Sequence, residues 1–298
     1  MNDLTQRAVA AAHAVAAAHG LRFDAAEVLN AGINVLVRLA PTDVVCRVAT
    51  TTGQMRGGGL GLRREVSIAA FLASQGLPVI PPSPQLPPGP HEYDGLWLSF
   101  WPYLPPIDAP IDAHAAAQAL RACHEALQDF PDALPAWGAW EEARQIRSGL
   151  EADGLLQPSD AAYLHAVTTH IDQRIADFDL PLYPIHGDAH YENVMHTTQG
   201  LLWFDWEDCF LGPREWDLAC MLRQSRVFNL HAERGPRALA AFGDSVRAEV
   251  LDTLILARDL QAISWGMLHS QQYADRDERV ATRMQRIRLH AAQAGVAA

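Results

Sequence analysis

Residues 186–195, with the sequence HGDAHYENVM, place two histidines, two acids and an asparagine within one short stretch. This stretch follows the apolar residues 181–185, and a second polar group, DWED at 205–208, follows the apolar residues 201–204. Charge this dense beside apolar runs is typical either of a solvated surface loop or of a reaction centre. The spacing of the oxygen-bearing side chains favours the reaction centre.

Three oxygen-bearing side chains surround a β-hairpin that the pattern predicts. Short strands are expected at 194–196 and 201–206, and their pairing would bring Asn193 and Asp205 to the same end of the hairpin. Asp188 lies in the preceding loop. Mg²⁺ keeps several waters and takes one or two protein carboxylates together with phosphate oxygens. The spacing therefore predicts Mg²⁺ at Asn193 and Asp205, with Asp188 available to accept a proton.

Three motifs in this region resemble the signature of the aminoglycoside phosphotransferase family, which also includes choline kinases and other small-molecule kinases. They are HGDAHYEN at 186–193, FDWE at 204–207 and GPREWDLA at 212–219, in the family's order and at its separations. Asp217, in the last motif, is expected to support the first motif from the start of a helix. Three motifs at matching separations are a specific signal, whereas one HGD tripeptide would mean little.

The resemblance implies an α+β protein with a two-lobed, protein-kinase-like fold. We expect a small antiparallel β-sheet N-lobe with one main helix, and a larger, mostly helical C-lobe. The second of two proline-rich stretches, residues 102–110, places the boundary, so residues 1–101 would form the nucleotide-covering lobe and residues 102–298 the catalytic and substrate-binding lobe.

The residue pattern along the chain agrees with this division. An N-terminal helix is followed by β-branched runs, and residues 51–61, which hold five glycines, are expected to form a mobile loop. The predicted strands are 35–39, 44–48, 95–101 and 182–185, together with the hairpin. The predicted helices are 62–75, 112–129, 158–177, 214–227, 236–260 and 273–294.

By the resemblance, the reaction is transfer of the γ-phosphoryl group of ATP (or GTP) to a hydroxyl of a small molecule. Asp188 would be the catalytic residue that orients the hydroxyl, while Asn193 and Asp205 would hold Mg²⁺ on the nucleotide phosphates. Arg47 is the expected phosphate-binding cation, in place of the lysine of protein kinases. Glu65 is expected to orient Arg47; the alternative is an exposed acid favoured by the helix dipole.

Three further residues are assigned to the nucleotide by position. Gly32 lies in a turn between two expected strands, where backbone N–H groups could cover the phosphates. Trp101 and Tyr103 follow the strand 95–101 and are expected to form the hinge beside the base; buried aromatic residues at a strand end are the alternative. Residues 57–61 lack the Gly-Lys-Ser/Thr of a P-loop and are interpreted as a connector.

The bulk composition limits the partners. The 298 residues are 49% hydrophobic and carry a net charge of −12, which argues against nucleic acid and anionic membranes and is compatible with a cationic substrate. The four cysteines are scattered and suit a reducing cytoplasm. Charged residues interrupt the alanine-rich start, and no apolar run is long enough to cross a membrane.

Together with the net charge, acidic residues directly after the predicted metal ligand and near the C-terminus favour an aminoglycoside-like polyhydroxylated amine as acceptor, which would connect the protein with antibiotic resistance. Alternatively, Glu207 and Asp208 cap neighbouring loops, or aromatic residues line a site for a quaternary amine. Choline, an amino alcohol or a sugar of primary metabolism therefore stays an alternative acceptor. The acids are Glu207, Asp208, Asp275, Asp277 and Glu278, and the aromatic residues are Trp206, Trp265 and Tyr273.

Two other classes of protein compete with this interpretation. A kinase-like nucleotide-binding protein without turnover would keep the same motifs. A zinc hydrolase would use the alternating His186, Asp188 and His190, although the remaining histidines show no grouping suited to further ligands. Activity on protein substrates is disfavoured because residues 205–213 are too few for a peptide-docking activation loop.

Overall fold

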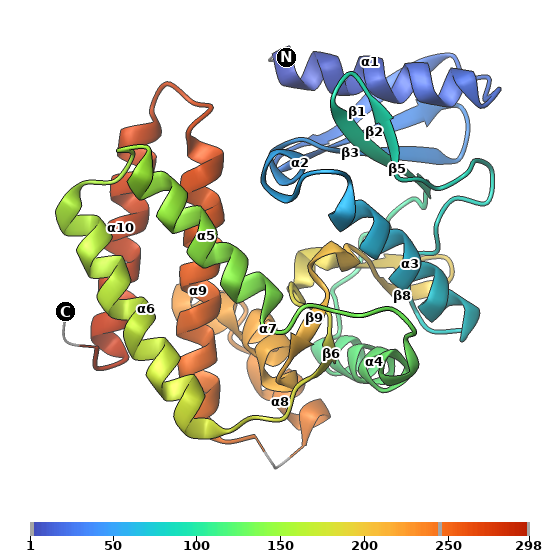
Figure 1. Ribbon diagram of the computed structural model, residues 1–298. Coiled ribbons are helices and arrows are strands. Elements are labelled where there is room, and N and C mark those ends of the chain that lie inside the picture. Colours follow the sequence, from blue (N-terminus) through green and yellow to red (C-terminus); the bar gives the residue numbers. More distant parts are fainter. Residues whose placement is uncertain (1–2, 244–245, 297–298) are drawn as a thin grey trace. The chain divides into compact units, whose positions relative to one another are not determined.

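The chain forms two compact units, drawn in Figure 1, in a computed structural model that describes residues 3–243 and 246–296. The first unit comprises Met1–Ile111 and Glu192–Asp208, and the second comprises Asp112–Tyr191 and Cys209–Ala298. Residues 192–208, which carry the predicted metal ligands, therefore cluster with the N-terminal unit. A functional division at residue 101 stays a prediction.

The first unit contains a five-stranded antiparallel sheet in the order β1-β2-β3-β5-β4. The predicted strands at 35–39, 44–48 and 95–101 are confirmed. These segments form strands because their β-branched and aromatic residues fit a half-buried pleated surface. Two further strands, β1 and β4, were not predicted; their residues are mostly exposed. The bounds are β1 Ala25–Ala31, β2 Asn34–Ala40, β3 Val44–Ala49, β4 His91–Tyr93 and β5 Leu96–Pro102.

One face of this sheet packs against helix α1, Asp3–Ala18, as Figure 1 shows. Alanines on the buried face of α1 let the helix approach the strands closely, and they form one core with alternate residues of β2, β3 and β5. Val44, Cys46 and Val48 of β3 belong to this core. Side chains alternate along a strand, so Arg47 points toward the opposite face of the sheet.

The predicted mobile loop at 51–61 is wrong in part, because helix α2, Thr51–Arg56, occupies its first half. The predicted helix at 62–75 is confirmed as α3, Leu60–Ser74. Between them, Gly57, Gly58 and Gly59 all have positive φ angles, which glycine adopts at no steric cost. A Cβ atom on Gly59 would lie 2.4 Å from the Trp97 ring. These glycines join two helices in a defined turn.

The expected hairpin is present in the first unit as β7, Val194–Thr197, and β8, Gly200–Trp203. Its second strand was predicted to reach residue 206 but ends at 203, because Asp205 takes the left-handed conformation at φ 68° and a short 3₁₀ helix, Trp206–Asp208, follows. The proline-rich segment after α3 pairs with β8, since Trp203 N donates to Pro78 O at 2.8 Å.

The second unit is mostly helical, with the two short strands β6, Tyr183–Ile185, and β9, Phe210–Gly212. Four predicted helices are confirmed: α4, α6, α7 and α10. The helix predicted over 236–260 is wrong, because Gly243 (φ 93°) ends α8 before α9 begins. Helix α5 was not predicted. The bounds are α4 Ala113–Ala126, α5 Gly138–Ala152, α6 Pro158–Phe178, α7 Arg214–Phe228, α8 Arg234–Phe242, α9 Ala248–Ser270 and α10 Arg276–Gln293.

Helix α9 is the central element of the second unit. It contacts α5, α6, α7 and α10, and its residues are buried almost all round. A helix surrounded in this way carries apolar residues on every face, so any charged residue in its middle needs a partner. Across the described residues, no helix is long and apolar enough to cross a bilayer.

We predict that Leu98→Ala in β5 will destabilise the first unit by about 2–5 kcal/mol, because the fully buried side chain would leave a cavity between the sheet and α1. The matched substitution Leu60→Ala, at a side chain that is 60% exposed, should change stability by less than about 0.5 kcal/mol. Urea unfolding of both variants measures the difference, and equal midpoints would contradict the assigned core.

Candidate active site

Arg47 lies at the centre of a buried group of carboxylates in the first unit. Its Nη1 atom donates to Glu65 Oε1 and to Asp205 Oδ1, both at 2.6 Å, and Nη2 lies 2.6 Å from Glu207 Oε1. The side chains of Arg47, Glu65 and Glu207 are each at most 7% exposed. The alternative of an exposed acid at Glu65 is therefore wrong, whereas the roles of Arg47 and Glu65 toward a nucleotide stay predictions.

The balance of charge in this cluster keeps Arg47 ionised. Burial alone would lower the pKa of the guanidinium, but the carboxylates of Asp205, Glu207 and Glu65 outweigh it and raise the pKa well above its ordinary value. A planar guanidinium offers several donors in fixed directions, so one arginine can engage three carboxylates. The cation predicted for phosphate is thus held by acids, among them the predicted metal ligand.

Glu207 and Asp208 were expected to recognise a cationic acceptor, but both pair with arginines of the first unit. Glu207 Oε2 lies 3.2 Å from Arg56 Nη1, and Glu207 Oε1 also accepts from Asn34 Nδ2 at 3.1 Å. Asp208 forms an ion pair with Arg56. Asn34 of β2 also accepts from Thr52 Oγ1 of α2 at 2.7 Å. Glu207 therefore contacts the sheet through Asn34 and α2 through Arg56.

Two of the three acids near the C-terminus, Asp275 and Asp277, also have arginine partners. Asp275 accepts from Arg279 Nε at 2.7 Å, and Asp277 lies 3.4 Å from Arg276 Nε. Asp275 and Asp277 are therefore paired with arginines of α10, although the Asp277 side chain stays 96% exposed.

Asn193 and Asp205 flank the open end of the β7–β8 hairpin, where Phe204 N donates to Asn193 O at 3.0 Å. Asn193 is buried, whereas the Asp205 side chain is 29% exposed. Asp205 has a left-handed backbone conformation, which is uncommon for residues other than glycine. Such conformations persist where the surrounding structure holds them, and they are frequent at functional sites. An amide oxygen and a partly exposed carboxylate are hard donors that fit Mg²⁺.

Asp188 lies in the second unit, and both of its carboxylate oxygens have cationic or aromatic nitrogen neighbours. Oδ1 accepts from Arg258 Nη2, and Oδ2 lies 3.4 Å from His190 Nε2. Burial would raise the pKa of Asp188, but Arg258 and then His190 outweigh it and hold the pKa well below its ordinary value. Asp188 is therefore ionised at neutral pH.

Asp217, at the start of α7, anchors the loop that carries Asp188. Its Oδ2 atom accepts from the backbone N–H of His186 at 2.7 Å and lies 2.7 Å from His124 Nε2, while Oδ1 accepts from Gly187 N at 2.8 Å. Asp217, His124 and His186 are all fully buried. The loop-supporting contacts predicted for Asp217 are present.

The His186 ring is part of this anchoring, because its Nδ1 atom accepts from Asp188 N at 3.3 Å. His186 and His190 thus contact different atoms of Asp188. Within residues 3–243 and 246–296, no group of three or more His, Cys, Asp or Glu side chains is arranged to hold a metal ion.

Sequence reasoning missed two residues of this site, His124 on α4 and Arg258 on α9. His124 lies 93 residues before Asp217 and Arg258 lies 70 residues after Asp188, so no local motif connects them. One signal was available: Arg258 and Asp259 interrupt an otherwise apolar stretch of α9, and charge in the middle of a buried helix requires a partner.

The three remaining predicted residues lie in the first unit near the sheet. Gly32 is in the β1–β2 turn, where its N–H donates to Asn34 O at 3.1 Å. Trp101, at the end of β5, donates its indole N–H to Ser99 Oγ at 2.9 Å. The Tyr103 ring stacks on the Arg38 guanidinium at 3.9 Å. Their contacts with a nucleotide stay predictions.

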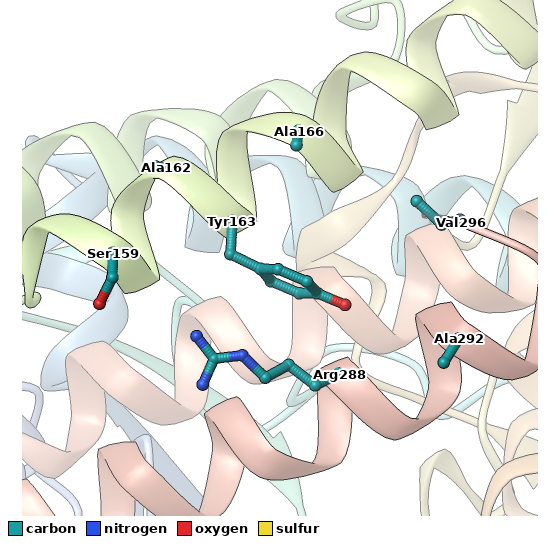
Figure 2. A pocket seen from close by; sticks show the side chains of 7 residues that line it. All are labelled: Ser159, Ala162, Tyr163, Ala166, Arg288, Ala292 and Val296. Carbon is teal, nitrogen blue, oxygen red and sulfur yellow. The ribbon is translucent and has the colours of Figure 1, made fainter. Parts of the chain in front are cut away.

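A hollow of about 670 Å³ in the second unit lies elsewhere, between α6 and α10, and Figure 2 shows its lining. Arg288 stacks on the Tyr163 ring there and donates to Asp160 at 2.7 Å. None of the predicted site residues lines it.

Replacement of Arg47 by methionine should destabilise the first unit by about 3–5 kcal/mol at neutral pH, because three carboxylates would lose a buried cation. Part of the loss should be recovered in the double variant Arg47→Met/Asp205→Asn, which removes one of the carboxylates that lose this cation. Denaturant unfolding of the three proteins measures this. An Arg47→Met protein as stable as the wild type would show that the cluster is not dependent on the arginine.

Asp217→Asn should increase amide hydrogen exchange at residues 186 and 187 and lower stability by about 2–3 kcal/mol, since the two backbone N–H groups lose a charged acceptor. The matched control is Asp252→Asn on the exposed side of α9, which should leave exchange in the loop unchanged. Unaltered protection at 186 and 187 in Asp217→Asn would contradict the anchoring role.

Known proteins share the family and the fold of this chain. The model of the phosphotransferase enzyme family matches residues 33–252. An amicoumacin kinase in complex with AMP-PNP, Ca²⁺ and amicoumacin superposes with a TM-score of 0.71 at 13% identity, covering 93% of this chain and 92% of that one. No protein matched in a search of curated protein sequences.

Two further solved structures have the same fold. An aminoglycoside phosphotransferase in complex with GDP and kanamycin has a TM-score of 0.69 at 15% identity, covering 95% of this chain and 98% of that one. The choline kinase of Streptococcus pneumoniae has a TM-score of 0.67 at 15% identity, covering 94% and 98%. The kinase-like α+β fold and the resemblance noted in the motifs are confirmed. The chain therefore belongs to the phosphotransferase enzyme family.

Proposed function

We propose that the protein transfers the γ-phosphoryl group of ATP or GTP to a hydroxyl of a small molecule. The observation that carries the proposal is the set Asp188, Asn193 and Asp205, at the family's separations in a member of a phosphotransferase family. The anchoring of Asp188 by Asp217 and the ion pairs around Arg47 support it, because a reaction of this kind depends on positioning and charge neutralisation.

Residues of the first unit would bind the nucleotide and its metal ion. Asn193 and Asp205 would hold Mg²⁺, which supplies neutralisation of the negative charge on the β- and γ-phosphates. Arg47, oriented by Glu65, would bind phosphate oxygens, and its present hold on Asp205 Oδ1 would then be exchanged for the nucleotide. Trp101 and Tyr103 would lie beside the base, and Gly32 would allow backbone to approach the phosphates.

Asp188 would orient the acceptor hydroxyl and take its proton. Its ionised carboxylate would accept a hydrogen bond from the acceptor hydroxyl and aim the oxygen lone pair at phosphorus. As the new P–O bond forms and the bond to the leaving nucleoside diphosphate breaks, the hydroxyl proton would pass to Asp188. A carboxylate of low basicity suffices here, because the hydroxyl proton becomes acidic only as the oxygen is phosphorylated.

For the acceptor, a polyhydroxylated amine such as an aminoglycoside is the first class to test, since a protein of the same fold binds kanamycin. Choline is the second, in view of the similarity to a choline kinase, followed by amino alcohols and sugars. Because Glu207 and Asp208 already pair with arginines, recognition of an amine would depend on other groups.

A nucleotide-binding protein without turnover is the second candidate function. It is favoured by one observation, the engagement of Arg47 with three carboxylates, one of them the proposed metal ligand. Measurement of nucleotide binding together with phosphoryl transfer separates the two candidates.

The test is an assay of phosphoryl transfer from Mg-ATP and Mg-GTP to aminoglycosides, choline-like amines and sugars. Asp188→Ala should lower turnover by about 10²–10⁴-fold, as for a lost general base, with nucleotide affinity unchanged. The control Asp252→Ala alters an exposed carboxylate of the same unit and should retain full activity. Full turnover in Asp188→Ala would exclude the assignment.

A further inference from the structure

Arg258 is absent from the motifs that carry the resemblance, yet it is the ion-pair partner of Asp188. We propose that Arg258 is a positioning residue of the acceptor site: it fixes Oδ1 of Asp188, so that Oδ2, beside His190, receives the acceptor hydroxyl. This inference rests on the catalytic role proposed above for Asp188.

The surroundings of Arg258 hold its guanidinium in one place. The residue is buried in the middle of α9, and its Nε atom donates to Cys220 Sγ of α7 at 3.1 Å while Nη2 reaches Asp188. Cys220 lies in turn 3.8 Å from the carbonyl oxygen of Gly187, next to Asp188 in the same loop. A guanidinium attached at two points loses the rotational freedom that a surface arginine keeps.

The helix that carries Arg258 is fixed by the next residue. Asp259 is fully buried, accepts from Arg223 Nε of α7 at 2.9 Å and lies 3.1 Å from His290 Nδ1 of α10. These contacts set the rotation of α9 about its axis. The direction in which Arg258 projects is therefore determined by contacts independent of Asp188.

The pairing has a chemical consequence for the transfer step. An arginine on Oδ1 stabilises the carboxylate, so Asp188 accepts the hydroxyl proton only when the P–O bond to the acceptor has largely formed. Because Oδ1 is engaged, the proton would go to Oδ2. The acceptor hydroxyl loses its proton to Asp188, the acceptor oxygen gains the phosphoryl group, and the nucleoside diphosphate leaves with its electron pair.

Several charged and titratable groups of the second unit that act on Asp188 come from its own loop, α9 and α7. Arg258 is the permanent cation among them. The groups are His186 and His190 of the loop, Arg258 of α9, and Cys220 and Asp217 of α7. Without Arg258, burial would favour the protonated form of Asp188, so the depressed pKa of this carboxyl depends on the arginine.

The primary experiment is an NMR titration of the carboxyl carbon of Asp188 in the full chain without ligand. Asp188 of the wild type should stay ionised to the lowest pH at which the protein remains folded. In Arg258→Met the Asp188 carboxyl should show a titration midpoint within the pH range in which the protein is folded, and Arg258→Lys should move this midpoint back toward the wild-type behaviour. Arg226→Met, at an exposed arginine of α7, is the matched control and should titrate as the wild type.

A kinetic cycle separates positioning from a structural role, using the acceptor that supports turnover in the assay above. Arg258→Met should lower kcat by about 10–100-fold, less than Asp188→Ala, with the KM for Mg-ATP within about twofold. In an Asp188→Asn background the same substitution should change the residual rate by less than about twofold. Equal losses in both backgrounds would assign Arg258 to folding alone.

The double variant Arg258→Met/Asp188→Asn also provides a protein without an unpaired buried charge, should Arg258→Met alone fold poorly. An unshifted Asp188 titration in a folded Arg258→Met protein would overturn the proposal. A shifted titration together with no transfer to any acceptor by the wild type would overturn the proposed function and leave the Arg258–Asp188 coupling in place.

Discussion

The high cost of burying an unpaired charge is the constraint on which this structure depends. In the first unit, Arg47 is compensated by Glu65, Asp205 and Glu207, and in the second unit Asp188 is compensated by Arg258. Except for Arg47 and Glu65, these pairs join segments at least 70 residues apart in the sequence, so the charges can be buried only when those segments are correctly folded. The same contacts that make burial tolerable give the site residues defined positions.

The use of arginine on β3 follows from this arrangement. A lysine presents one compact ammonium group, whereas the guanidinium of Arg47 directs two nitrogens at three carboxylates. Glu207 is the third carboxylate on Arg47, besides Glu65 and Asp205. It also contacts Arg56 and Asn34 and so connects β3, α2 and β2. Glu207 and Asp208, two of the acids that suggested a cationic acceptor in the sequence, are thus part of the internal charge balance of the first unit.

Local pattern was a good guide where burial on one face imposes periodicity. The strands β2 and β3 were predicted from their β-branched residues, and the helix α3 from apolar residues at helical spacing. The mostly exposed β1 carries no such pattern. Around the glycines at 57–59, composition indicated a loop, whereas positive φ angles and contact with the Trp97 ring make a turn between two helices.

The sequence by itself determined the family and the identity of Asp188, Asn193, Asp205 and Asp217 as candidates, because these residues belong to short motifs whose chemistry requires particular side chains at particular separations. Only the tertiary structure decided their partners. Arg258, His124 and Glu207 act on groups 70, 93 and 160 residues away (207 − 47 = 160), and no local rule connects side chains across such intervals. Their contacts exist because packing brings charged groups together where water is excluded, and there each charge requires a partner.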